Sequence, residues 1–366
     1  GFSARETTVT PALQEYRLWQ ALANFGGIDY FVMGTLDNKK DKRAYEKIRG
    51  VFSYAAEHEE LLSSASSCAD VLLVRSSYQI PDPEERGWIR VLTELHIPFD
   101  ETLTASLGDR LKDNYKLIIM PNKGSIPAPL VPAISSYVKN GGKLLCSAKV
   151  PARDSQFLEI LGLDSVSAEA EVYGSYFRTE EELVVPVGDS CLKCSDASAE
   201  SLYSVMPAQK FGPPEVCYVQ EEPTQSFGLY INTYGNGKAA FIPWKAGSLY
   251  YSEGYDVWFE FMKKVLEEKL GALSVAPTLS PMVEVTVGRC KEGTLLSFVN
   301  GSGHFGNSFF SPVEIENAVI ELPWNEESFS CTSLYRKDNC TAELIDRKLR
   351  ITVKKLGFFE QIVVNR

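Results

Sequence analysis

The sequence has few histidines, a residue on which many catalytic and metal sites depend. Only three histidines, His58, His96 and His304, occur in its 366 residues. No Gly-x-x-x-x-Gly-Lys-Ser/Thr motif and no convincing Gly-x-Gly-x-x-Gly motif is present, so the usual phosphate cradles are not indicated. The sequence therefore gives no direct sign of a nucleotide-dependent enzyme.

Positive charge and long apolar runs are also scarce. The formal net charge is −11 and the sequence pI is about 5.0, which argues against nucleic acid or an anionic membrane as the main partner. No apolar run approaches the roughly 20 residues of a membrane span. No signal peptide is visible, and eight cysteines in a chain of this length do not suggest a disulfide framework. We therefore expect a cytoplasmic protein with free thiols.

The middle of the chain shows regular alternation of strands and helices. Residues 115–121 and 143–148 are apolar runs typical of buried parallel strands, and residues 129–139 between them have helical spacing and end at Gly141-Gly142. This βαβ unit predicts a parallel sheet over residues 67–275. Residues 165–236 lack helical periodicity and predict an antiparallel β insertion, with strands near 170–176, 183–187, 215–219 and 227–233.

The two ends of the chain follow different patterns. Residues 276–366 alternate apolar and polar side chains without a convincing helix, which predicts a small all-β sandwich. Residues 1–66 predict a helix from Pro11, a strand at 28–33 and a second helix capped by Asp41. One strand cannot form a sheet alone, so this helix-strand-helix segment indicates the end of a larger structure.

Cys146 stands at the end of the second strand of the βαβ unit, where some α/β enzymes place a nucleophile. Such a residue needs a sharp turn, commonly flanked by glycines, and a base that makes the thiolate. The flanking residues are Leu145 and Ser147, and no histidine follows in the α/β region. A small buried core residue is the alternative interpretation, and it agrees better with these neighbours.

Other candidate positions carry weaker signals. Cys191 and Cys194 form a Cys-x-x-Cys pair without a second pair, so they predict two unpaired thiols rather than a zinc site. Asp37 is a turn aspartate unless residues 28–33 belong to a barrel, in which case it would lie at the active face. Trp244 and Tyr250 belong to an aromatic group that could stack on sugar rings or pack an interface. No metal or cofactor is expected.

These segments carry a resemblance to a known family. The runs Ala69–Val74, Tyr115–Pro121 and Tyr137–Leu145, with Gly237–Trp244, resemble the trimerisation domain of glycoside hydrolase family 42 β-galactosidases. That resemblance implies a flavodoxin-like, class I glutamine amidotransferase-like parallel sheet without the amidotransferase triad. It also implies that residues 1–66 are a remnant of a catalytic (β/α)8 barrel and that residues 276–366 are the closing sandwich.

The resemblance also sets the functional expectation. In the family the catalytic glutamates come from earlier barrel strands, which this chain does not include, so no catalytic residue is carried over. The expected role is a non-catalytic, oligomerising part of a bacterial glycoside hydrolase, with itself as partner, possibly as a trimer, and carbohydrate bound by the parent enzyme. A cysteine-dependent amidotransferase-like hydrolase using Cys146 and a carbohydrate-binding module are the alternatives.

Overall fold

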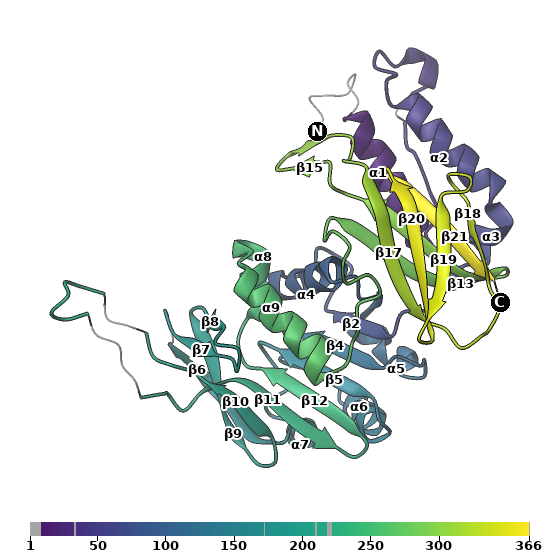
Figure 1. Ribbon diagram of the computed structural model, residues 1–366. Coiled ribbons are helices and arrows are strands. Elements are labelled where there is room, and N and C mark those ends of the chain that lie inside the picture. Colours follow the sequence, from purple (N-terminus) through teal and green to yellow (C-terminus); the bar gives the residue numbers. More distant parts are fainter. Residues whose placement is uncertain (1–8, 33, 172, 209–210, 218–221, 366) are drawn as a thin grey trace. The chain divides into compact units, whose positions relative to one another are not determined.

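The computed structural model divides the chain into two compact units (Figure 1). Unit 1 comprises residues 1–69, 93–98 and 274–366, and unit 2 comprises residues 70–92 and 99–273. In the parts of the chain that the structure describes, no helix is long and apolar enough to cross a bilayer. The described residues are 9–32, 34–171, 173–208, 211–217 and 222–365.

Unit 2 is built on a seven-stranded sheet with the order β10-β11-β12-β5-β4-β2-β3. The strands β12, β5, β4, β2 and β3 are parallel, whereas β11 and β10 add an antiparallel edge. All five residues of β4 are buried, because helices cover both faces of a parallel sheet. The predicted βαβ unit is confirmed. The strands span β2 (Val71–Arg75), β3 (Phe99–Leu103), β4 (Leu117–Pro121), β5 (Lys143–Ser147), β10 (Glu200–Ser204), β11 (Phe227–Tyr234) and β12 (Gly237–Ile242).

Helices α6 and α7 lie on one side of this sheet, and α4 and α9 lie on the other (Figure 1). The start and end of α7 follow from its sequence: Asp154 accepts a hydrogen bond from the Phe157 amide, and Gly162 ends the helix with a φ of +70°. After β12 the chain forms α8 and then α9, which passes directly into a π-helical turn, η4. The bounds are α4 (Pro83–Glu94), η3 (Thr104–Ser106), α5 (Leu107–Arg110), α6 (Leu130–Lys139), α7 (Ser155–Leu161), α8 (Ala246–Glu253), α9 (Asp256–Lys264) and η4 (Val265–Lys269).

The β insertion of unit 2 forms short antiparallel pairs, β6 with β9 and β7 with β8. A strand was predicted at 215–219, but residues 215–217 lie in a turn and the residue that follows it. Residues 218 and 219 lie outside the described part of the chain. The strands span β6 (Leu163–Glu171), β7 (Tyr176–Arg178), β8 (Val184–Pro186) and β9 (Ser190–Asp196).

Unit 1 contains the predicted antiparallel sandwich. A five-stranded sheet, β1-β13-β14-β21-β18, and a three-stranded sheet, β17-β20-β19, share one hydrophobic core, to which Phe298 and Ile362 contribute from the first sheet and Ile320 and Ile351 from the second. The hairpin β15-β16 is separate. The strands span β1 (Ser66–Ser67), β13 (Val283–Cys290), β14 (Gly293–Asn300), β15 (His304–Phe305), β16 (Ser308–Phe309), β17 (Ile315–Pro323), β18 (Ser330–Ser333), β19 (Cys340–Ile345), β20 (Lys348–Leu356) and β21 (Phe359–Asn365).

The N-terminal helices belong to the same unit as this sandwich. Trp19 stacks on Phe359 with ring centroids 4.3 Å apart, and the Tyr54 hydroxyl donates to the Gln361 side chain at 2.7 Å. The first helix starts as predicted, with Thr10 as its N-cap. The helices span α1 (Pro11–Ala23), η2 (Leu36–Asn38), α2 (Tyr45–Glu57) and α3 (Glu59–Ser63).

Two predictions for the N-terminal segment are wrong. Residues 28–32 form neither helix nor strand, because an isolated strand has no neighbour to take its backbone hydrogen bonds; Met33 lies outside the described residues. Asp41 does not cap the second helix, which begins at Tyr45 after Ala44, and its carboxylate binds Arg43 instead. The predicted division into domains 1–66, 67–275 and 276–366 stays a prediction.

Candidate functional site

The carboxyl ends of the parallel strands in unit 2 are the natural place for a site, because open α/β sheets bind ligands there. Polar side chains gather at these ends and at the start of α4. Together with the turn residue Ala148, they form what we call the strand-end cluster. Its polar members are Ser76 after β2, Asn122 and Lys123 after β4, Ser147 at the end of β5, and Glu84 and Glu85 of α4.

The residue at the turn after β5 is Ala148. Its φ is +60°, a left-handed conformation that costs a residue with a Cβ roughly 1–2 kcal/mol. Its amide donates to the Ile242 carbonyl at 2.9 Å. In nucleophile-elbow enzymes the strained residue at such a turn carries the reactive side chain. Here it carries a methyl group that is 4% exposed, so the turn is present without a nucleophile.

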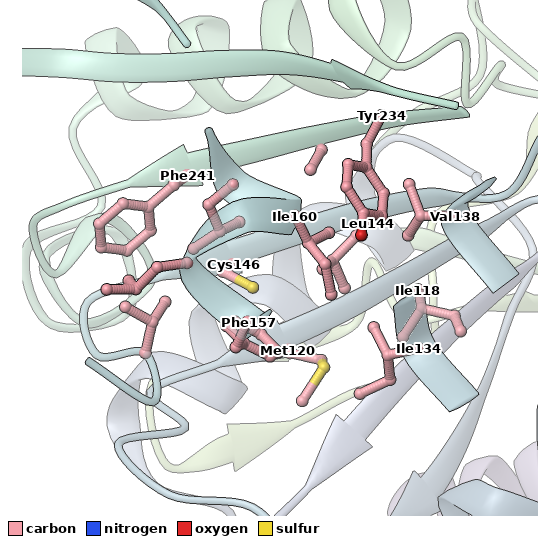
Figure 2. Close-up of a cluster of buried hydrophobic side chains, with 14 of the residues drawn as sticks. Ile118, Met120, Ile134, Val138, Leu144, Cys146, Phe157, Ile160, Tyr234 and Phe241 are labelled. Atoms are coloured by element: carbon pink, nitrogen blue, oxygen red, sulfur yellow. The ribbon is translucent and has the colours of Figure 1, made fainter. Parts of the chain in front are cut away.

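Cys146 lies two residues earlier, inside β5, between Met120 of β4 and Phe241 of β12. Figure 2 shows its sulfur among buried hydrophobic side chains, including Phe157 and Ile160. The residue is 1% exposed, and burial raises the pKa of its thiol well above the usual range. Unit 2 contains no histidine. In this structure Cys146 is therefore a core residue.

Glu84 is the most densely bonded carboxylate of the strand-end cluster. One oxygen accepts from the Ser147 hydroxyl at 2.6 Å, the Trp88 indole at 3.1 Å and the Gly247 amide at 3.1 Å. The other accepts from the amide and hydroxyl of Ser248 at 2.8 and 3.0 Å. The amides belong to the first turn of α8, where a negative charge is favoured. Burial nevertheless outweighs these bonds and raises the pKa of Glu84.

Glu85, its neighbour on α4, is held by a cation. The Lys123 Nζ lies 2.6 Å from a Glu85 carboxylate oxygen and 2.8 Å from the Ser76 hydroxyl. The side chains of the ion pair are 4% and 1% exposed. Burial is the largest influence on the pKa of Glu85 and raises it, but the bonds with Lys123 and Ser76 together outweigh burial and lower the pKa.

The strand-end cluster satisfies its own charges and donors. The Ser147 hydroxyl binds Glu84 and also accepts from the Trp88 indole at 2.8 Å, and Ser147 is fully buried. A catalytic acid, base or nucleophile must reach its substrate, but Glu84, Glu85, Lys123 and Ser147 are buried. Ser76 is exposed and Asn122 is partly exposed. The cluster therefore fixes the turns at the strand ends. Sequence reasoning missed it, and the adjacent Glu84 and Glu85 in the first turn of a helix were the available signal.

The predicted substrate-binding residues belong to two different units of the chain. Trp244 is 1% exposed, donates to the Gly228 carbonyl at 2.9 Å and packs against aromatic rings. Tyr250 is 5% exposed, and the Arg90 guanidinium lies 4.4 Å above its ring. Both belong to unit 2, whereas Asp37 is exposed on η2 in unit 1. A role in substrate binding stays a prediction for all three.

The remaining motifs lie in β structure. Cys191 and Cys194 are buried on β9, and burial raises the pKa of Cys194 to about 12. The run Gly301-Ser-Gly-His-Phe-Gly306 has the letters of a dinucleotide fingerprint but includes β15 of a hairpin instead of opening a helix. Among the described residues, no group of three or more His, Cys, Asp or Glu side chains is placed to hold a metal ion.

No protein-family model and no curated protein matches the sequence, but solved structures match the fold. An α-L-fucosidase isoenzyme 2 from Paenibacillus thiaminolyticus is 16% identical, with a TM-score of 0.77 over 98% of this chain and 58% of that one. A β-galactosidase from Bacillus circulans sp. alkalophilus is 13% identical, with a TM-score of 0.64 over 97% and 52%. The GH42 β-galactosidase Gan42B of G. stearothermophilus is 14% identical, with a TM-score of 0.63 over 98% and 51%.

Identities this low show a shared fold and do not show a shared activity. The chain spans little more than half the length of each of these proteins. The resemblance predicted from the hydrophobic strands and glycine stops is confirmed at that level: this chain is related in fold to the GH42 β-galactosidases and to the fucosidase.

Proposed function

We propose that this chain is a non-catalytic portion of a glycoside hydrolase resembling β-galactosidase, which supports oligomer formation and the active site of its parent enzyme. The observation that carries the proposal is the strand-end cluster. At the carboxyl ends of the strands, the ionisable side chains Glu84, Glu85 and Lys123 are buried and bonded to partners within the protein. Ala148 stands at the turn where a nucleophile would be. The solved structures that share the fold are glycoside hydrolases by name, which supports the proposed enzyme class.

The finer assignment of unit 2 is part of the same proposal. Its parallel strands run β3-β2-β4-β5-β12, which in chain order is second, first, third, fourth and fifth. That order supports a flavodoxin-like sheet and, through the family resemblance, a class I glutamine amidotransferase-like domain. We assign residues 1–66 to the end of a catalytic barrel. The family resemblance and the presence of helices α1 and α2 support this assignment, although the expected strand at 28–33 is not seen in residues 28–32.

The proposal predicts that the purified chain does not hydrolyse glycosides. Nitrophenyl β-galactosides and α-fucosides, the sugars in the names of the similar proteins, are the first substrates to assay. Turnover that persists through purification and disappears on substitution of one of this chain's carboxylates would overturn the proposal. A loss of turnover during purification would instead identify a contaminating enzyme.

The proposed partner is a second copy of this chain, with a trimer as the expected assembly, in a cytoplasmic setting and with no nucleic acid or membrane involved. Multi-angle light scattering over a range of concentrations measures the mass directly. A mass near three times 40.7 kDa is expected. A monomer at the highest concentration would contradict the oligomerising role.

The rival, a hydrolase that uses Cys146, makes a different prediction. It requires a thiolate at neutral pH that alkylates rapidly. The buried thiol predicts that iodoacetamide labels Cys146 only after unfolding, whereas the exposed Cys68 and Cys217 label in the native protein. Peptide mapping after timed labelling distinguishes them, and fast labelling of Cys146 would favour the hydrolase.

A further inference from the structure

Two cysteines of unit 1 lie close together on different sheets of the sandwich. Cys331 is on β18, an edge strand of the five-stranded sheet, and Cys340 is on β19, an edge strand of the three-stranded sheet. Their Sγ atoms are 3.5 Å apart. Both side chains pack against the sandwich core and are partly exposed.

The chain between these cysteines is held in place by a buried carboxylate. Glu360, on β21, is fully buried. One of its oxygens accepts from the Tyr335 and Arg336 amides at 3.1 and 3.4 Å, and the other accepts from the Asn339 side chain at 2.7 Å. Asn339 is further bound to the Lys355 backbone, with its side-chain nitrogen 2.8 Å from the carbonyl. Three residues between the two cysteines, Tyr335, Arg336 and Asn339, are thereby held in place.

We propose that Cys331 and Cys340 form a dithiol site that two-electron oxidants convert into a disulfide linking the two sheets of the sandwich. A disulfide requires a sulfur separation of about 2.05 Å, so the two sulfurs need to approach by about 1.5 Å. Rotation about the Cα–Cβ bonds of two edge-strand residues supplies movements of that size without altering the strand pairing.

The chemistry balances with a peroxide as oxidant. The thiolate of Cys340 attacks one oxygen of hydrogen peroxide, forms a sulfenic acid and releases hydroxide. The sulfur of Cys331 then displaces the second hydroxide and forms the S–S bond. Two thiols lose two electrons and two protons, and one peroxide becomes two waters. Contact with the Cys331 thiol lowers the pKa of Cys340, which supports Cys340 as the first nucleophile.

The other cysteines provide internal comparisons. Cys68 and Cys217 are exposed, so oxidation of either one through a contact with another molecule is the main side reaction. The experiment therefore uses the full chain with the substitutions Cys68→Ser and Cys217→Ser. The matched controls add Cys331→Ser or Cys340→Ser to that background.

The test treats the background protein with hydrogen peroxide, alkylates the remaining thiols under denaturing conditions and maps the peptides. We expect a single pair of peptides joined through Cys331 and Cys340. Its mass should be about 2 Da below the sum of the two free-thiol peptides, as one S–S bond requires. Dithiothreitol should reverse the loss, and neither control variant should show it. Separate alkylation of both cysteines after peroxide treatment, or sulfinic acid at Cys340 without a crosslink, would overturn the proposal.

A second measurement does not depend on peptide recovery. The loop closed by the bond is short, and such a link typically raises the melting temperature of a sandwich of this size by several degrees, about 5 °C. The unfolding transition of the background protein should rise by that amount on oxidation and return on reduction, whereas both control variants should not change. If the background protein treated with peroxide shows no crosslink and an unchanged melting temperature, the proposed dithiol site is contradicted.

Discussion

The strand-end cluster of unit 2 and the dithiol site of unit 1, Cys331 and Cys340, each lie near a buried glutamate but differ in the reactivity expected of their cysteines. At each place a buried glutamate, Glu84 or Glu360, accepts several hydrogen bonds and fixes nearby backbone. Cys146, which precedes the Ser147 that bonds Glu84, is 1% exposed. Near Glu360 two partly exposed sulfurs lie 3.5 Å apart.

The position of a cysteine at the end of a strand says little about its reactivity. Cys146 stands where a nucleophile could stand, and burial raises its pKa. Cys331 and Cys340 stand on edge strands without any catalytic motif, yet each has surface access and a neighbouring sulfur. Access and a second reacting group decide what a thiol can do.

The largest loss of stability is expected when Lys123, the one cation among the named residues of the strand-end cluster, is removed. Lys123→Met leaves the Glu85 carboxylate buried without its ion-pair partner, which typically costs about 3–5 kcal/mol of stability. Urea unfolding measures the loss, and hydrogen exchange of the β4 and β5 amides reports on unit 2 itself.

A surface ion pair in the same unit provides the control for that experiment. Lys116 lies 2.7 Å from Asp70, but the two side chains are 72% and 56% exposed. Lys116→Met should therefore change stability by less than about 1 kcal/mol. Equal losses for Lys123→Met and Lys116→Met would show that burial does not distinguish the two pairs.

Much of the fold could be predicted from the sequence, whereas the strand-end cluster could not. The apolar runs of β4 and β5 and the Gly141-Gly142 stop predicted the βαβ unit because both faces of such strands are buried. The cluster joins Glu84 to Gly247, which are 163 positions apart. No local pattern encodes such a meeting, and the helix that presents Gly247, α8, was itself not predicted.

The N-terminal segment shows the opposite failure. Residues 28–32 have the composition of a strand, but strand composition without a partner strand does not produce a sheet. Likewise, Cys331 and Cys340 lie on edge strands of two different sheets, and their approach depends on how those sheets pack, which no local pattern encodes. The proximity of the two cysteines therefore could not be read from the sequence.

The buried carboxylates can be compared through the pH dependence of stability. The pKa of Glu84 and that of Glu360 are raised, mainly by burial, so each contributes stability that is complete below about pH 4.5 and is lost as the pH rises through the raised value. The pKa of Glu85 is lowered, so its contribution is present above about pH 4.5 and is lost as the pH falls through the lower value.

Glutamine substitutions should therefore diverge with pH. Relative to the unsubstituted protein, Glu84→Gln and Glu360→Gln should cost most near pH 4.5 and less toward pH 8, with losses of about 1–3 kcal/mol. Glu85→Gln should cost most at neutral pH and less below pH 4.5. Urea unfolding of each variant across this range measures the difference. Parallel profiles for Glu84→Gln and Glu85→Gln would refute the distinction between the two neighbours.

The smallest change in stability is expected at the turn after β5, where a substitution tests whether the backbone is strained. Ala148 adopts a φ of +60°, which glycine adopts without a Cβ clash, although glycine also loses more entropy on folding. Ala148→Gly should therefore stabilise the protein, by about 0.5 kcal/mol. Asn122, after β4, has a φ of +52°, but asparagine tolerates this region, so Asn122→Gly should give a smaller gain or none. Urea unfolding of both variants measures these changes in stability. A loss of stability in Ala148→Gly would mean that packing of the buried methyl group outweighs the backbone strain. The turn after β5 could then no longer be described as a strained elbow.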